Sequence, residues 1–186
     1  MSVDLRSPVL PSDIWCGEAY GRREVETGFR TWVAFDAGLR EGVASFAIFR
    51  HGFRPSGTEW VSGAREFLWP PCATPHDVPD RGDRLLDLVL DGDYLVAAYQ
   101  QAYGIDLTDP GLDMHWHRFV ALLRGLPGDT VLAEAMRMRG WRDDRRSMAE
   151  VNKSLRSQWS LPARDDARTL SWQQQTFGPV AERARR

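Results

Sequence analysis

Apolar side chains recur at three- to four-residue steps along most of this chain, a spacing typical of amphipathic helices. The first segment differs. In "DIWCGEAYGRREVET", the apolar residues Ile14, Cys16 and Tyr20 surround Gly17, a residue that favours turns. We therefore expect a small β-hairpin in front of a mainly helical fold.

Two helices are predicted in the N-terminal half. The first has Thr27 as its cap and Gly42 beyond its end, with apolar residues at Phe29, Trp32, Val33 and Phe35. The second follows Thr58, is stopped by Pro70 and Pro71, and has apolar residues at Trp60, Ala64, Phe67 and Leu68. The stretch "VASFAIFRHGFRPSG" between them fits a strand or a helix.

Further helices are predicted in the C-terminal half. One is recapped at Asp91 or Asp93 and ends at Gly104. The next has Asp109 and Pro110 at its start and Gly125 with Pro127 at its end. Another begins at Asp129. The last helix places one apolar stripe on a single face, formed by Met148, Val151, Leu155 and Trp159.

The expected fold is mainly α, with the hairpin followed by a compact bundle of about five or six helices. We expect a leader over residues 1–12, one helical domain over 13–162, and a polar, arginine-ended tail over 163–186. The role of residues 43–82 and of the tail is left open. The expected structural core contains Phe29, Trp32, Tyr94, Trp116, Phe119, Leu123, Gly125 and Pro127.

Composition narrows the class of protein. An apolar content of 42% with eight Trp and eight Phe is typical of a folded globule. Two cysteines without a CxxC spacing fit a reducing compartment, and the sequence has no 18-residue apolar run. We expect a soluble protein that is not bound to a membrane.

The sequence "MHWHRF" raises the possibility of a metal site at His115 and His117. On a helix that starts near Pro110, however, the two imidazoles point about 200° apart at 100° per residue. In that geometry His115 lies at the edge of the apolar stripe, whereas His117 lies on the far face and pairs with Asp113. We therefore expect no metal at this position.

Catalytic motifs are missing from the sequence. It has no glycine-rich phosphate loop, GxSxG elbow or HExxH, and acidic pairs such as Asp91 with Asp93 fit helix caps. The expectation is a protein without enzymatic activity and without a cofactor.

The C-terminal part is basic in an otherwise acidic chain. Residues 137–186 hold 12 basic and 6 acidic residues. A basic cluster can bind nucleic acid, but Asp143 and Asp144 lie within this one and partly cancel it. Tryptophans beside arginines are also typical of protein interfaces, although they fit equally well a role in docking the last helix.

Five segments resemble, in order and spacing, the bacteriophage gene-product-fifteen family. They include "CGEAYGRREVETGFRTWVAFD", "DGDYLVAAYQQAYGIDL", "MHWHRFVALLRGLPGDT" and "RMRGW". The resemblance spans residues 13–162 with a divergent middle, and the last basic helix is rich in arginine where the family is rich in lysine.

This resemblance implies a tail assembly chaperone that binds and solubilises the tape measure protein during tail morphogenesis. The implied partners are the tape measure protein and the major tail protein, with a homo-oligomer left open. The implied location is the host cytoplasm rather than the mature virion. The alternatives are a structural minor tail component retained in the virion and, further off, a helical nucleic-acid-binding regulator. Our hypothesis for the partner surface is Arg137, Trp141, Arg145 and Trp159.

Overall fold

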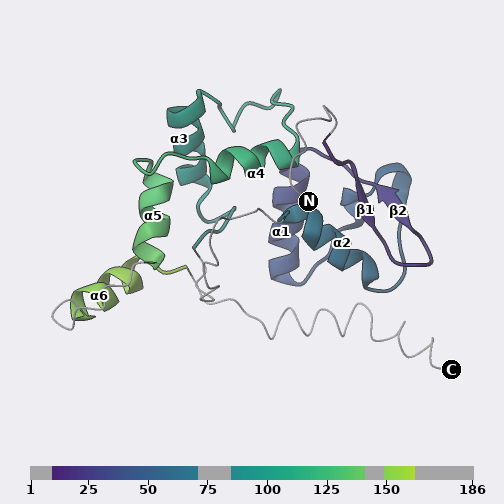
Figure 1. The fold of residues 1–186 in the computed structure, drawn as a ribbon, viewed down its shortest axis with the longest axis horizontal. Helices are drawn as coiled ribbons and strands as arrows, with labels where there is room; N and C mark the ends of the chain where they lie inside the picture. Colours follow the sequence, from purple (N-terminus) through teal and green to yellow (C-terminus); the bar gives the residue numbers. More distant parts are fainter. Residues whose placement is uncertain (1–9, 71–84, 141–148, 162–186) are drawn as a thin grey trace. The chain divides into compact units, whose positions relative to one another are not determined.

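The computed structural model describes residues 10–70, 85–140 and 149–161 (Figure 1). Within these ranges a two-stranded antiparallel hairpin is followed by six α-helices. The expected mainly α fold with an N-terminal hairpin is therefore confirmed. The helices are α1 (Phe29–Glu41), α2 (Glu59–Leu68), α3 (Gly92–Tyr103), α4 (Trp116–Arg124), α5 (Val131–Gly140) and α6 (Ala149–Trp159).

Backbone contacts divide the chain into two units. Among the described residues, unit 1 comprises 10–70 and 113–121, and unit 2 comprises 85–112, 122–140 and 149–161. The division falls within α4, and each unit is described by itself below. The prediction of one domain over residues 13–162 stays a prediction, and the proposed tail lies outside the described residues.

The hairpin of unit 1 pairs β1 (Asp13–Trp15) with β2 (Arg22–Glu24). The turn closes through Gly17 and Gly21, whose φ angles of 93° and 63° lie in the left-handed region that favours glycine. The backbone amide of Cys16 donates to the carbonyl of Gly21 at 2.9 Å. The hairpin predicted around Gly17 is thus confirmed.

Helix α1 ends where the sequence predicts, because Gly42 adopts a left-handed conformation and its amide bonds back to Gly38. Its start differs from the prediction. Gly28, not Thr27, occupies the N-cap position, and no side chain caps the helix. The carbonyl of Thr27 instead accepts the backbone amide of Trp116, a pairing between distant segments that local pattern does not reveal.

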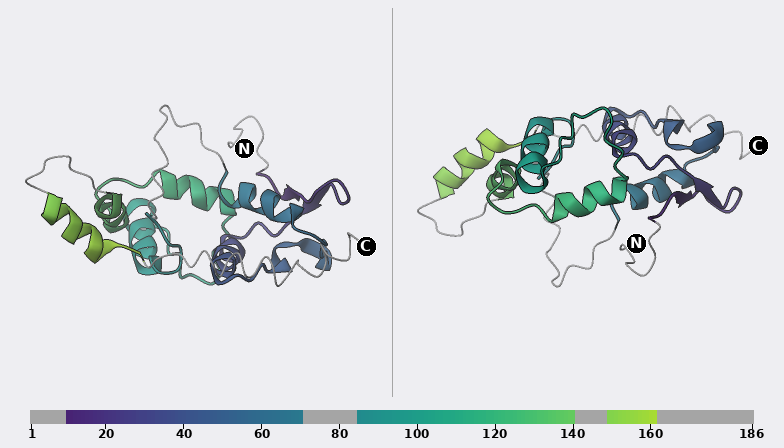
Figure 2. Two further views of the ribbon diagram at one scale, coloured as in Figure 1. Left: turned by 90° about the horizontal axis from the view of Figure 1, so that it is seen from below. Right: turned by 90° about the horizontal axis from the view of Figure 1, so that it is seen from above.

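Helix α2 begins after Thr58 as predicted and packs against strand β1, as Figures 1 and 2 show. Gly63 permits this approach. A Cβ atom at Gly63 would lie 2.1 Å from the backbone oxygen of Trp15, so any side chain there would push the strand away from the helix. The backbone of strand β1 therefore packs directly against the backbone of α2 at Gly63.

Between α1 and α2, the stretch that fits a strand or a helix forms two short 3₁₀ turns, Phe46–Ile48 and Arg50–Gly52. Ile48 and Phe49 are buried, and the amide of Glu26 donates to the carbonyl of Ile48 at 2.8 Å. This segment closes one side of the unit 1 core.

The core of unit 1 is built from aromatic rings. Trp32 stacks on Phe67 with ring centroids 4.4 Å apart, and Phe119 stacks on Trp116 at 5.2 Å. Edge and stacked contacts of this kind add about 0.5–1.5 kcal/mol per pair beyond the area buried. The buried aromatic side chains of this unit are Phe29, Trp32, Phe35, Phe49, Trp60, Phe67, Trp116 and Phe119.

Unit 2 contains α3, α5 and α6. Helix α5 packs against α3 and also against α6 (Figure 2). Helix α3 ends at Gly104, whose φ of 65° makes it a left-handed C-cap, as predicted. Helix α5 begins at Val131, two residues beyond the predicted Asp129. The hydroxyl of Thr130 caps it by accepting the amide of Ala133 at 3.3 Å.

A buried ion pair joins the helices of unit 2. The guanidinium of Arg139 on α5 makes two hydrogen bonds of 2.7 Å to the carboxylate of Asp91, at the start of α3. It also donates to the backbone oxygens of Leu85 and Trp159, each at 2.8 Å. Asp91 is the N-cap residue of α3, but no side-chain cap bond forms, because this carboxylate accepts from Arg139 and from the amide of Asp87.

The face that α6 buries differs from the predicted stripe. Val151 is exposed and Asn152 is buried, while Leu155 and Trp159 are half-buried. Met148 lies outside the described residues. The helix is turned so that the polar Asn152 packs inward, an arrangement that apolar periodicity alone does not predict.

Candidate functional site

The helix that carries the His-Trp-His motif is shorter than predicted. Helix α4 begins at Trp116, not near Pro110. The carboxylate of Asp109 accepts the amide of Gly111 in a local turn instead of capping a helix. His115 forms a β-bridge with Gly28, and this extended pairing fixes where the helix starts.

His115 is the N-cap of α4. Its Nδ1 accepts the backbone amide of His117 at 3.0 Å, so this nitrogen carries no proton. Its Nε2 therefore holds the proton and donates to the carbonyl of Pro11 at 2.9 Å. Burial lowers the pKa of His115, and the bond to Pro11 and the charge of Asp113 oppose this effect. The geometry requires the neutral imidazole.

The side chains of the next two residues donate hydrogen bonds to the last carbonyls of α2. The indole Nε1 of Trp116 donates to the carbonyl of Leu68 at 2.8 Å, and Nε2 of His117 lies 3.0 Å from the carbonyl of Phe67 and donates to it. Both carbonyls belong to the last turn of α2, where no helical partner remains. The motif thus caps two helices at once: α4 by its first histidine and α2 by the two residues that follow.

The prediction that His117 faces away from the core is wrong. His117 is buried, and its ring centroid lies 5.4 Å from that of His115. The predicted i,i+4 pairing with Asp113 rests on a helix that would include both residues, whereas Asp113 precedes α4 and is exposed. Among the described residues, no group of three or more His, Cys, Asp and Glu side chains is placed to hold a metal ion.

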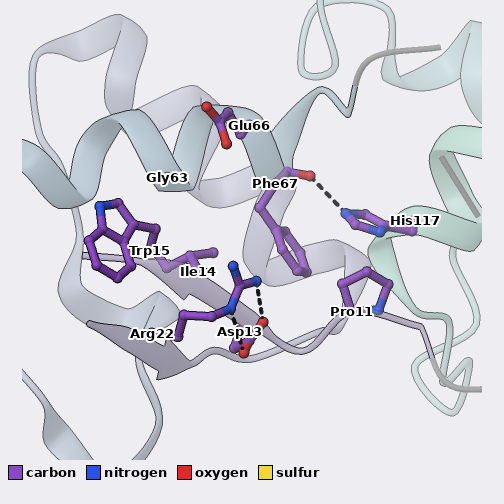
Figure 3. A pocket seen from close by; sticks show the side chains of 9 residues that line it. All are labelled: Pro11, Asp13, Ile14, Trp15, Arg22, Gly63, Glu66, Phe67 and His117. Carbon is purple, nitrogen blue, oxygen red and sulfur yellow. Dashed lines mark hydrogen bonds and ion pairs between the residues drawn. The ribbon is translucent and has the colours of Figure 1, made fainter. Parts of the chain in front are cut away.

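A pocket of about 70 Å³ opens beside His117 in unit 1 (Figure 3). Strand β1, strand β2 and helix α2 supply most of its wall. Figure 3 shows the Arg22 guanidinium against the Asp13 carboxylate on one side and Glu66 on the helix opposite. The lining residues are Pro11, Asp13, Ile14, Trp15, Arg22, Gly63, Glu66, Phe67 and His117.

The strongest polar contact in this pocket is bidentate. Arg22 donates from Nε and Nη2 to the two carboxylate oxygens of Asp13, at 2.9 and 2.6 Å. This pairing lowers the pKa of Asp13 and raises the pKa of Arg22. The carboxylate of Glu66 also raises the pKa of Arg22, so Arg22 interacts electrostatically with both carboxylates of the pocket.

Sequence reasoning did not single out the charged residues of this pocket. A signal was present, because Asp13 and Arg22 are diagonal neighbours across the hairpin that the sequence predicts. Glu66 carried no such signal, since its place opposite the hairpin depends on how α2 packs against β1.

The residues predicted to bind a partner fall in unit 2 or outside the described residues. Arg137 is exposed and forms an ion pair with Glu134 at 2.6 Å. Trp159 is half-buried, with its ring 6.5 Å from that of Tyr94. Trp141 and Arg145 lie outside the described residues. Arg139, part of the basic cluster considered for nucleic acid, is buried against Asp91.

Six of the eight residues assigned to the core lie in the interior or at its margin. Phe29, Trp32, Trp116, Phe119 and Leu123 are buried, and Tyr94 is half-buried. The other two, Gly125 and Pro127, are exposed. They shape the turn after α4 instead of filling space: the amide of Gly125 bonds to Leu122, and the carbonyl of Pro127 accepts from Thr130.

Within the described part of the chain, every helix is too short or too polar to cross a membrane. Comparisons with curated proteins and with solved structures find no match.

The family model described as "Bacteriophage Gp15 protein" matches residues 72–159. This segment contains the motif that caps α4 and all the described helices of unit 2. The match indicates a bacteriophage structural or morphogenesis protein. Residues 72–159, just under half of the chain, are therefore similar to the bacteriophage gene-product-fifteen family.

Proposed function

We propose that this protein is a phage tail assembly chaperone, which binds the tape measure protein and keeps it soluble until the tail forms. The proposal assigns it a binding role without catalysis. A long helical protein with exposed apolar stripes aggregates unless another surface covers those stripes. Such a chaperone acts in the host cytoplasm and is absent from the finished virion.

The observation that carries the proposal is the exposure of apolar side chains in the segment that matches the family. Val89 and Leu90, in the turn before α3, are 56% and 58% exposed. Val131, at the start of α5, and Val151, on α6, are each 48% exposed. Aliphatic groups of this kind lose contact with water when a partner covers them, at about 25 cal/mol per Å² of apolar area.

The charged rim of such a surface lies on α5. Arg137 is exposed, and its side chain shares the helix with the exposed Val131. Rim charges of this kind steer association and set partner choice more than they add affinity. We therefore assign Arg137 to the partner surface with the exposed apolar residues of unit 2, while Trp159 contributes through its partly exposed ring.

The direct test is co-expression with the tape measure protein encoded by the same phage. The expected result is a tape measure protein that stays soluble only when this chain is present, and that elutes with it during purification. A tape measure protein that is equally soluble alone would contradict the proposal. Stoichiometric amounts of this chain in purified virions would favour the alternative of a minor tail component.

A matched pair of variants locates the surface. Leu90→Ser in unit 2 and Val43→Ser in unit 1 each replace an apolar side chain that is 58% exposed. We expect Leu90→Ser to lower the soluble fraction of the tape measure protein several-fold, because it removes contact area, and Val43→Ser to leave that fraction unchanged. Equal effects of the two variants would show that the partner does not distinguish the two units.

A further inference from the structure

The pocket between the hairpin and α2 has an excess of negative charge. Asp13 and Glu66 contribute two carboxylates, and Arg22 contributes one guanidinium. The positive charge of Arg22 is engaged locally, because two of its nitrogens bond to Asp13. In the described part of the chain, no hydrogen bond or ion pair fixes the carboxylate of Glu66, a residue of α2 that lines the pocket (Figure 3).

The remaining walls suit the stem of a long side chain. Pro11, Ile14 and Phe67 present apolar surface, and the indole of Trp15 is 46% exposed. Because Gly63 has no side chain, the backbone of Trp15 lies against α2, and this brings the hairpin wall of the pocket close to the helix wall. A cation over an exposed indole gains about 0.5–1 kcal/mol. An aliphatic stem with a charged end matches apolar walls that lead to a carboxylate.

The same walls disfavour an anion. The two carboxylates repel negative charge, and Nε and Nη2 of Arg22 already donate to Asp13. The proton on Nε2 of His117 is likewise held by the carbonyl of Phe67.

We propose that this pocket binds the cationic end of a lysine or arginine side chain from a partner protein, between Glu66 and the indole of Trp15. The inference relies on the proposed function only for the identity of that partner, which would be the tape measure protein. The binding of the cationic group itself depends on the pocket alone.

The test uses N-acetyl-arginine amide as a probe, titrated into the full chain and followed by NMR at the indole N–H of Trp15. We expect a saturable shift of this signal, assigned with Trp15→Phe. N-acetyl-citrulline amide, which has nearly the same shape without the charge, should bind at least about threefold more weakly, since an exposed ion pair contributes a few-fold in affinity.

Two variants that each remove one negative charge distinguish binding at the pocket from a general effect of the protein's net charge. Glu66→Gln should weaken binding of the arginine probe about two- to fivefold, and Glu41→Gln, at the exposed end of α1, should leave it unchanged. Both residues are exposed, so we expect both variants to keep the fold, and thermal melting checks this. No shift at Trp15, equal binding of the citrulline probe, or equal effects of the two variants would overturn the proposal.

The outcomes distinguish this inference from the proposed function. A pocket that binds the arginine probe remains a cation site even if the tape measure protein is soluble without this chain. Conversely, a tape measure protein that depends on this chain, together with a pocket that ignores the probe, would leave the chaperone role standing and remove this pocket from it.

Discussion

Large rings fill the interior of unit 1, where Trp32, Trp60 and Trp116 are each fully buried, whereas the helices of unit 2 meet around a buried ion pair. Apolar burial is favourable in many packing arrangements. The pair between Arg139 and Asp91 is directional, because both hydrogen bonds need one orientation of the guanidinium. Unit 2 also buries apolar side chains, among them Leu95, Tyr99 and Leu132, so the comparison teaches that the ion pair adds to this apolar core a contact that forms in one orientation only.

The two units also differ in what they leave exposed. Among the described residues, unit 2 exposes four aliphatic side chains, at Val89, Leu90, Val131 and Val151, whereas two of the three large apolar residues that unit 1 exposes are tryptophans. In unit 2 a buried apolar core and a directional ion pair fix the helices, while these aliphatic groups stay at the surface. This is the arrangement expected of a surface that a partner covers.

The largest effect should come from the aromatic core of unit 1. Trp32→Ala removes a fully buried ring that stacks on Phe67 and donates to the carbonyl of Glu26. We expect the free energy of unfolding to fall by about 4 kcal/mol, measured by urea denaturation followed by circular dichroism. Trp15→Ala is the control, because its ring is half exposed, and it should cost about 1 kcal/mol or less. Similar losses in both variants would contradict the assignment of the core.

A smaller and more localised effect should follow from breaking the ion pair of unit 2. Arg139→Met leaves the carboxylate of Asp91 buried without its partner and should cost about 3 kcal/mol. Hydrogen exchange should speed up in α3, α5 and α6 while α1 and α2 stay protected.

The double variant Arg139→Met with Asp91→Leu sharpens this test. Replacing both charges by apolar groups removes the desolvated carboxylate, so at least half of the lost stability should return. If the double variant is less stable than Arg139→Met, the other bonds of Asp91, such as that to the amide of Asp87, matter more than its charge.

The smallest expected effect is a loss of stability at mildly acidic pH, caused by His115 in unit 1. Because the folded state lowers the pKa of His115 from its ordinary value of 6.5, chiefly by burial, the unfolded chain binds the proton more readily. The stability that this contributes is complete above about pH 6.5 and is lost progressively as the pH falls below it. Thermal melting between pH 7.5 and 5.5 should show this decline.

His115→Asn provides the comparison, since asparagine can cap α4 without titrating in this range. The variant should lose part of the pH dependence, and an unchanged dependence would contradict the role given to His115. The lowered pKa values of Asp13 and Glu134 act on stability only at more acidic pH, so they do not obscure this range.

The sequence predicts those parts of the fold that depend on neighbours along the chain. The glycine that ends α1, the glycine that ends α3 and the turn of the hairpin all follow from the backbone preference of glycine. The predictions are wrong where a contact with a segment distant in the sequence determines the local structure. Helix α4 starts at Trp116 because His115 pairs with Gly28, and Asp91 bonds to Arg139 instead of capping its own helix.

The candidate site shows the same division. The diagonal pair of Asp13 and Arg22 follows from a predicted hairpin once its register is known. The positions of Glu66 and His117 do not, because they depend on helices that meet only in the folded chain.

The bridge between His115 and Gly28 has a consequence for any attempt to shorten the chain. The start of α4 needs the carbonyls of Pro11 and Thr27, and the bonds to Phe67 and Leu68 come from the same N-terminal part. A fragment limited to residues 72–159, the portion that matches the family, would lack every one of these acceptors. Its indole and imidazoles would be left facing water, and such a fragment should self-associate more strongly than the chain of residues 1–186.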